Sequence, residues 1–319
     1  MTDRPTLDDI YAATERLRGI AVRTPVVPLH SYDASSDILL KLENLQPIGS
    51  FKLRGIFNAV ASLSPERRAA GISTTSSGNT AQALAWAGRY FGVTARSLMP
   101  ADAPVAKIEA MRSYGGTPVL VTREHLFSYM AEHGWDEEPY AFIHPWIDPV
   151  VMAGAGTIGL EILEYVPDVE TIFIPVGGGG LSSGIGTAVK AMRPDIRIVA
   201  VEPDGCCALS QSLAAGKPMS VTCNTICDGV AVPLVVPEVF EILREVIDDV
   251  VLVSDDDVKK TIKHLALRNK LVTEGSGALA ATAALSLPSA QRGKSVCIVT
   301  GGSIEPTFFA SIVTDPTLD

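Results

Sequence analysis

Short apolar runs alternate with longer segments of helical periodicity from about residue 37 to residue 303. The apolar runs have the length of buried strands, and the segments between them are long enough for crossover helices. Repeated units of this kind build mostly parallel sheets that helices cover on both faces, so the predicted fold class is α/β. The nine predicted strands are residues 38–42, 71–75, 93–99, 117–121, 140–143, 171–176, 196–202, 250–253 and 296–300.

The domain organisation follows from the length and from the lack of linkers. A chain of 319 residues is long enough for two lobes, and no low-complexity segment or fixed-period repeat separates them. Short crossings must then join the lobes, and we place them near Pro65 and near His144 and Pro145. We predict a discontinuous large domain, residues 1–64 and 145–319, and a small domain, residues 65–144.

The charge balance restricts the partners of the chain. Lys and Arg number 26 against 36 Asp and Glu, and the net charge of −10 disfavours nucleic acid and anionic membranes. The N-terminal segment lacks the basic-then-apolar order of a signal peptide, and no apolar stretch approaches the ~20 residues of a membrane span. We therefore expect a cytoplasmic protein that does not enter a membrane.

The cysteines predict neither a disulfide framework nor a metal centre. The chain has five of them, an odd number for a disulfide framework, and no Cys-x-x-Cys pair or nearby histidine indicates zinc. We predict buried or unreactive thiols, and no metal site. The five are Cys206, Cys207, Cys223, Cys227 and Cys297.

Four consecutive glycines follow the predicted strand at residues 171–176 and precede a helix predicted over residues 184–192. Without side chains, the backbone N–H groups of Gly177, Gly178, Gly179 and Gly180 can converge on one anion, and the helix N-terminus adds positive potential. A tight turn alone would need only one glycine. The pattern therefore predicts a phosphate site, although no Gly-Lys-Ser/Thr follows as in a P-loop.

Two other glycine motifs allow different interpretations. Residues 154–159 match the dinucleotide pattern G-x-G-x-x-G, but no convincing strand precedes them, so we expect a helix packing seam. Residues 180–184 match the G-x-S-x-G nucleophile elbow of hydrolases and do follow a strand. A serine hydrolase using Ser182 therefore stays open, with His264 as the histidine downstream.

Lys52 lies at the predicted first turn of a helix that begins soon after Gly49. The positive end of a helix disfavours an ammonium ion, and the neighbouring Phe51 adds an apolar surface. Both effects favour a neutral, nucleophilic amine of the kind that forms a Schiff base. Taken alone, Lys52 would be interpreted as a solvent-facing lysine.

Two more strand ends carry hydroxyl groups and flexible backbone. The turn at residues 75–80 follows one predicted strand and opens a helix, which suits either a carboxylate cradle or simple helix capping. Thr300 ends the last strand and is followed by two glycines. Open α/β sheets place their ligands at such carboxyl edges.

Three segments together resemble the pyridoxal-phosphate (PLP) enzymes of fold type II, and most closely the threonine/serine dehydratase and serine racemase group. They are residues 42–55, residues 76–79 and residues 175–181, and residues 149–161 resemble the central helix of the same group. The likeness covers essentially the whole chain. It implies two lobes built around a PLP site.

The resemblance also implies roles for individual residues. Lys52 would form the Schiff base with the cofactor and act as the general base, with Ser77 as a second catalytic residue on the opposite face. Phe51 would pack beside the ring, Asn79 would bind the ring hydroxyl and Thr300 would face the ring nitrogen. The phosphate would be held by Gly177, Gly178, Gly179, Gly180 and Leu181, and the substrate carboxylate by Ser76, Ser77, Gly78, Asn79 and Thr80.

Several positions depart from the pattern of the group. Thr80 stands where His is usual, Ser77 matches the racemases, and Trp146 matches the aromatic residue of the dehydratases. The divalent-metal site of the racemases is only half present, since Glu202 matches but Ala208 stands where a carboxylate is expected. The chain also ends without the regulatory domain of the biosynthetic threonine dehydratases, so feedback control is not expected.

The predicted function is PLP-dependent dehydration and deamination of a small β-hydroxy amino acid, with L-threonine or L-serine favoured, to a 2-oxo acid and ammonia. A hydroxyl partner for the ring nitrogen makes the ring a milder electron sink, which suits elimination. The alternatives are a serine or aspartate-type racemase, a 3-hydroxyaspartate dehydratase, the hydrolase using Ser182, and a non-catalytic amino-acid-binding protein. The expected partners are a small amino acid and a second copy of the chain in a homodimer.

Overall fold

The computed structural model describes residues 4–30 and 37–318, and within them the strands form two sheets. The larger sheet has six strands and is parallel except where β1 pairs with β2. The smaller sheet has four parallel strands. In spatial order the larger sheet is β1 (Val26–Pro28), β2 (Ile38–Lys41), β10 (Ser295–Ile298), β7 (Thr171–Pro175), β8 (Arg197–Pro203) and β9 (Asp249–Val253), and the smaller one is β5 (Thr117–Val121), β4 (Ala95–Pro100), β3 (Ile72–Thr75) and β6 (Ala141–Phe142).

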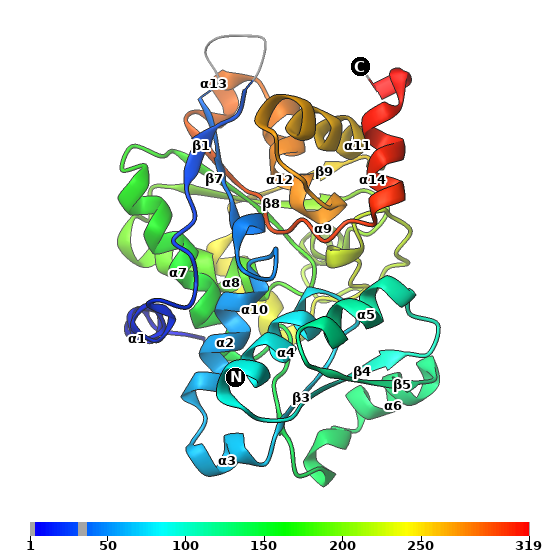
Figure 1. Cartoon of the computed structure of the whole chain (residues 1–319). Helices are drawn as coiled ribbons and strands as arrows, with labels where there is room; N and C mark the ends of the chain where they lie inside the picture. The colour runs from blue at the N-terminus through cyan, green and yellow to red at the C-terminus, as the bar shows by residue number, and fades with distance from the viewer. Residues whose placement is uncertain (1–3, 31–36, 319) are drawn as a thin grey trace.

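Helices fill most of the connections between strands, as expected for parallel neighbours, which need crossovers. The smaller sheet and its helices lie in the lower half of Figure 1, and the larger sheet lies in the upper half. The helices are α1 (Leu7–Leu17), α2 (Lys52–Ser62), α3 (Pro65–Ala69), α4 (Asn79–Phe91), α5 (Val105–Ser113), α6 (Arg123–Ala131), α7 (Pro149–Tyr165), α8 (Gly180–Met192), α9 (Ala208–Ala215), α10 (Pro237–Val246), α11 (Asp255–His264), α12 (Gly275–Ser286), α13 (Ser289–Arg292) and α14 (Pro306–Thr314).

The central strands of the larger sheet are buried on both faces, which explains their continuous apolar sequence. Along β7, Phe173 faces a core with α11 and α12, whereas Ile172 and Ile174 face a second core with α7 and α8. Side chains alternate across a strand, so the one buried strand serves two helical layers. The predicted α/β class with mostly parallel sheets is confirmed.

The nine predicted strands all occur, with ends shifted by at most two residues, and the structure adds the short edge strand β1. Helix α8 begins at Gly180 rather than at the predicted residue 184. Its first residues therefore belong to the glycine tetrad itself. Among the described residues, no helix is long and apolar enough to cross a membrane.

Candidate active site

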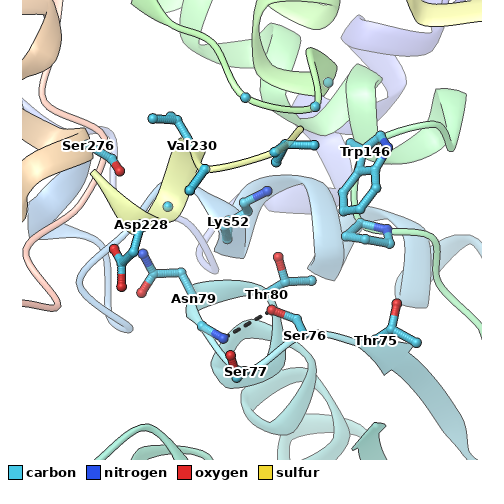
Figure 2. A pocket seen from close by; sticks show the side chains of 18 of the residues that line it. Lys52, Thr75, Ser76, Ser77, Asn79, Thr80, Trp146, Asp228, Val230 and Ser276 are labelled. Carbon is cyan, nitrogen blue, oxygen red and sulfur yellow. Dashed lines mark hydrogen bonds between the residues drawn. The ribbon is translucent and has the colours of Figure 1, made fainter. Parts of the chain in front are cut away.

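A cavity of about 430 Å³ opens where the carboxyl ends of strands from both sheets meet. The tetrad follows β7, the turn at residues 76–80 follows β3, and Thr300 follows β10. Figure 2 shows several of these residues around Lys52. The lining includes all the predicted site residues, namely Phe51, Lys52, Ser76, Ser77, Gly78, Asn79, Thr80, Gly177, Gly178, Gly179, Gly180, Leu181 and Thr300.

Lys52 is the first residue of α2, as predicted, and its amine reaches the cavity. Burial lowers the pKa of Lys52 to about 8, while the nearby carboxylate of Glu274 acts in the opposite direction. The Nζ atom lies 5.0 Å from the centroid of the Phe51 ring. A substantial fraction of this amine is therefore neutral near pH 8, as a nucleophile or a base requires.

The start of α2 is tied to the end of β10. The Phe51 backbone N–H donates to the Thr300 carbonyl at 3.0 Å, and Ser50 pairs with Gly301 in an isolated β-bridge. The hydroxyl group of Thr300 donates to the Ser276 carbonyl at 3.2 Å. These bonds hold the lysine and the threonine hydroxyl at fixed positions on the same wall of the cavity.

The glycine tetrad is a cradle whose close packing leaves no room for side chains. A Cβ atom at Gly178 would lie 2.6 Å from the Trp146 ring, and one at Gly180 would lie 2.8 Å from the Trp146 carbonyl oxygen. Gly179 has a φ of +87°, in the left-handed region that favours glycine. The backbone N–H groups and the N-terminus of α8 are therefore accessible to an anion such as a phosphate.

Hydrogen bonds within the turn at residues 76–80, and one from β4 of the smaller sheet, hold this turn in place. The Gly78 N–H donates to the Ser76 hydroxyl at 3.1 Å, as drawn in Figure 2, and the Ser97 hydroxyl donates to the Ser76 carbonyl at 2.7 Å. Helix α4 then begins at Asn79. Hydroxyl groups and the N-terminal amides of a helix meet here, an arrangement suited to a carboxylate.

Glu274 is a cavity residue that sequence reasoning missed. Its side chain is buried and accepts a hydrogen bond of 2.9 Å from Asn79 Nδ2 and one of 3.1 Å from the Ser303 N–H. Burial, with a smaller effect of Asp228, raises the pKa of Glu274 to about 7. The sequence signal that could have indicated this residue is an acidic residue between Thr273 and a glycine, just before an apolar helix.

Two buried oxygen atoms of the site lack a partner within the described residues. They are Asn79 Oδ1 and Ser276 Oγ, and both residues line the cavity. Buried polar atoms are nearly always hydrogen-bonded in folded proteins, so unsatisfied ones at a cavity indicate a polar ligand. Together with the glycine cradle and the buried lysine, they fit a phosphate-bearing aromatic cofactor such as PLP.

The other glycine motifs do not form ligand sites. Residues 154–159 lie inside α7, and a Cβ atom at Gly184 would lie 2.1 Å from the Met152 carbonyl oxygen, which confirms a packing seam between α7 and α8. Ser182 is buried in α8, and His264 Nε2 lies 2.7 Å from the His30 carbonyl oxygen. Neither is among the described residues that line the cavity, so the geometry gives the hydrolase no support.

The prediction that all cysteines carry thiols was wrong. Cys206 and Cys223 form a disulfide, while Cys207, Cys227 and Cys297 are free. The two cysteines are close in the fold, which their spacing in the sequence does not reveal. The Asn224 N–H donates to the Gly205 carbonyl at 2.9 Å and so aligns the two segments that carry them.

Glu202, the matching half of the metal site of the racemase group, contacts the start of a helix. The Glu202 carboxylate accepts hydrogen bonds of 2.8 Å from the N–H groups of Leu209 and Ser210, and so caps the start of α9. Among the described residues, no group of three or more His, Cys, Asp or Glu lies close enough together to hold a metal ion.

Comparisons with known proteins agree with this geometry. The family described as "Pyridoxal-phosphate dependent enzyme" matches residues 17–301. L-threonine ammonia-lyase of Thermotoga maritima is 37% identical over 97% of this chain and 78% of its own length. The structure of maize serine racemase has a TM-score of 0.90 at 33% identity and covers 97% of each chain.

A further solved structure, the processed form of threonine deaminase isoform 2 from Solanum lycopersicum, has a TM-score of 0.86 at 31% identity, and covers 100% of this chain and 92% of its own. With relatives of this identity over nearly the whole chain, the resemblance seen in the sequence is confirmed. The chain belongs to the family of pyridoxal-phosphate dependent enzymes, with the fold of type II, and PLP is its cofactor.

Proposed function

We propose that this protein is a PLP-dependent ammonia-lyase that converts a small β-hydroxy amino acid, L-threonine or L-serine, into a 2-oxo acid and ammonia. The observation that carries the proposal is the placement of Lys52, a buried lysine with a pKa near 8, in the same cavity as an unobstructed glycine cradle. The threonine ammonia-lyase and threonine deaminase among its relatives support the same reaction.

Each predicted residue has a task in this reaction. The tetrad and Leu181 would hold the phosphate group of the cofactor, Asn79 and Thr300 would bind the polar groups of its ring, and the residues from Ser76 to Thr80 would orient the substrate carboxylate; all of them line the cavity. PLP, when bound, supplies the electron sink that makes the substrate Cα proton easier to remove. Lys52 Nζ takes the Cα proton.

The overall chemistry balances without an added oxidant or reductant. Loss of the Cα proton and of the β-hydroxyl group removes one water from the amino acid and leaves an enamine. Water then hydrolyses the tautomer of this enamine to the 2-oxo acid and ammonia. Phe51 and Trp146 place apolar surface on the cavity and limit the access of water to Lys52.

The proposal is tested by absorbance spectroscopy and by product analysis on the purified protein. We expect a yellow chromophore that borohydride bleaches, release of 2-oxo acid from L-threonine or L-serine, and loss of both properties in Lys52→Ala. Lys190→Ala, in the last turn of α8, is the matched control because Lys190 does not line the cavity. A protein that lacks the chromophore after incubation with PLP contradicts the proposal.

Racemisation is a second candidate, which the presence of Ser77 in the same cavity as Lys52 favours. A racemase needs an acid on the ring face opposite the base, and the resemblance assigns that task to Ser77. Ser77→Ala should then lower D-serine formation from L-serine by about 100-fold or more, as for loss of a general acid, and lower pyruvate release less. Chiral chromatography of the products separates the two outcomes.

The proposal also covers the domain organisation, the assembly and the location of the protein. We propose residues 65–144, which contain the smaller sheet, as a separate small domain, and a homodimer as the active assembly. We also propose a cytoplasmic location, which the three free thiols support and the Cys206–Cys223 disulfide does not. Limited proteolysis, sedimentation and cell fractionation test the three in turn.

A further inference from the structure

One wall of the cavity is apolar and comes from α6. Leu126, Phe127 and Met130 all line the cavity from this helix. Phe127 is 72% exposed, although it is a large aromatic residue, so its ring offers free contact area at the edge of the cavity. Single exposed apolar residues are common, but a group of them inside a ligand cavity indicates a surface for an apolar ligand group.

This wall adjoins the place where the substrate carboxylate is proposed to bind. Met130 Sδ lies 3.0 Å from Thr75 Oγ1, the last residue of β3, and the turn at residues 76–80 follows directly. When the substrate carboxylate binds at that turn and its Cα faces Lys52, the β-substituent points along this side of the cavity. This orientation of the substrate rests on the proposed function.

The charges of the cavity disfavour an acidic β-substituent. The described lining contains two cationic side chains, Lys52 and Lys107, and two carboxylates, Asp228 and Glu274. Lys107 forms an ion pair with Asp228, so its charge is already neutralised. A second carboxylate on the substrate would find no unpaired cation beyond the catalytic lysine, and it would meet the repulsion of Glu274, the lining acid outside this ion pair.

We propose that Leu126, Phe127 and Met130 determine specificity. They select β-hydroxy amino acids with an apolar β-substituent, including groups larger than the methyl group of threonine, and they reject 3-hydroxyaspartate. Each methylene group buried on this wall should raise kcat/KM about fourfold until the space is filled. Threonine is then a better substrate than serine, and a β-ethyl group is better still.

The substrate series tests the first part of this inference. We expect kcat/KM for 2-oxo acid release to rise from L-serine to L-threonine to 3-hydroxynorvaline, and to be at least about tenfold lower for 3-hydroxyaspartate than for L-threonine. Equal or better use of 3-hydroxyaspartate overturns the proposal. So does a preference for serine over both larger apolar substrates.

Variants of the wall test the residues themselves. Phe127→Ala should lower the ratio of kcat/KM for 3-hydroxynorvaline to that for L-serine by about tenfold, because it removes contact area for the larger group. Phe127→Arg should raise the use of 3-hydroxyaspartate relative to threonine. Val105→Ala is the matched control, since Val105 is 73% exposed but does not line the cavity. An equal change for all substrates in Phe127→Ala assigns Phe127 a merely structural role and overturns the proposal.

Failure of this inference is distinguishable from failure of the proposed function. If no β-hydroxy amino acid yields a 2-oxo acid, the reaction is wrong, but the wall is still tested by calorimetric binding of L-norvaline and L-aspartate to the PLP-loaded protein. Tighter binding of L-norvaline, lost in Phe127→Ala, supports the wall. Tighter binding of L-aspartate overturns it.

Discussion

At the scale of single residues, the pKa of Lys52 depends on two opposing effects. Burial removes water from the ammonium ion and lowers the pKa to about 8, and the carboxylate of Glu274 raises it again. The sequence suggested the helix N-terminus and Phe51 as the causes of a neutral amine. The structure retains both neighbours but makes burial in the cavity the larger cause.

Glu274→Gln should therefore lower the pKa of Lys52 below about 8, because glutamine fills the same space without the negative charge. The measurement is the rate at which the apoprotein captures PLP, followed by absorbance as a function of pH. Since only the neutral amine reacts, the midpoint of the profile should move to lower pH in the variant. Glu241→Gln, at an exposed position of α10, should leave the midpoint in place, and an unshifted midpoint in Glu274→Gln would contradict the assigned coupling.

At the scale of elements, the β7–α8 junction depends on backbone geometry that only glycine provides. Gly179→Ala should cost about 1–2 kcal/mol for its positive φ alone, and more because the added Cβ would lie 2.5 Å from Val239 Cγ1. PLP affinity should fall with it, since the amides of the cradle move. Gly216→Ala is a matched control with a φ of +68° and open space around it. It should lower the free energy of unfolding but leave PLP affinity unchanged, and equal losses of affinity in both variants would exclude a specific cradle.

The disulfide ties the β8–α9 connection to the segment that leads to residues 228–233 of the cavity. Its two cysteines are 17 residues apart, and closing a loop of this size in the unfolded chain stabilises the fold by about 3 kcal/mol. Cys223→Ser should lower the free energy of unfolding by that order in urea titrations, and reductant should do the same to the wild type. Cys207→Ser serves as control because its thiol is free, and a wild type insensitive to reductant would argue against the bond.

The elements that sequence could predict are those with their own periodic signal. All nine predicted strands and the first turn of α2 were right, because buried parallel strands and glycine-marked helix starts carry local patterns. β1 was missed, since a three-residue edge strand ending in Pro28 has no such pattern. Glu274 and Phe127 were missed as cavity residues for a related reason: their segments meet the cavity only through tertiary packing.

At the scale of the whole molecule, the site exists because two sheets present their carboxyl ends to one cavity. The larger sheet contributes the phosphate cradle and Thr300, whereas the smaller sheet contributes the turn at residues 76–80 and the wall on α6. Lys52 lies on α2, which packs against α7 and α4 and so connects the two halves. Relative movement of the two sheets would therefore change the distance between the phosphate cradle and the turn at residues 76–80.

The ion pair of Lys107 and Asp228 joins the two halves across the mouth of the cavity, from α5 to the segment before α10. Asp228→Asn should raise KM for the amino acid severalfold with little change in the melting temperature, because the pair is partly exposed and aids closure more than folding. It should also lower the pKa of Glu274 from about 7, since Asp228 is one cause of its rise.

The dependence of KM on salt concentration tests whether the Lys107–Asp228 ion pair aids closure of the cavity or only stabilises the fold. KM of the wild type should rise as ionic strength screens the pair, whereas KM of Asp228→Asn should respond less. Glu109→Gln, which breaks an ion pair within α5, is the matched control and should behave as the wild type. An Asp228→Asn variant with wild-type KM and wild-type salt response would show that the two halves close without this pair, and that hydrogen bonds such as that from Asn79 on α4 to Glu274, just before α12, hold them together instead.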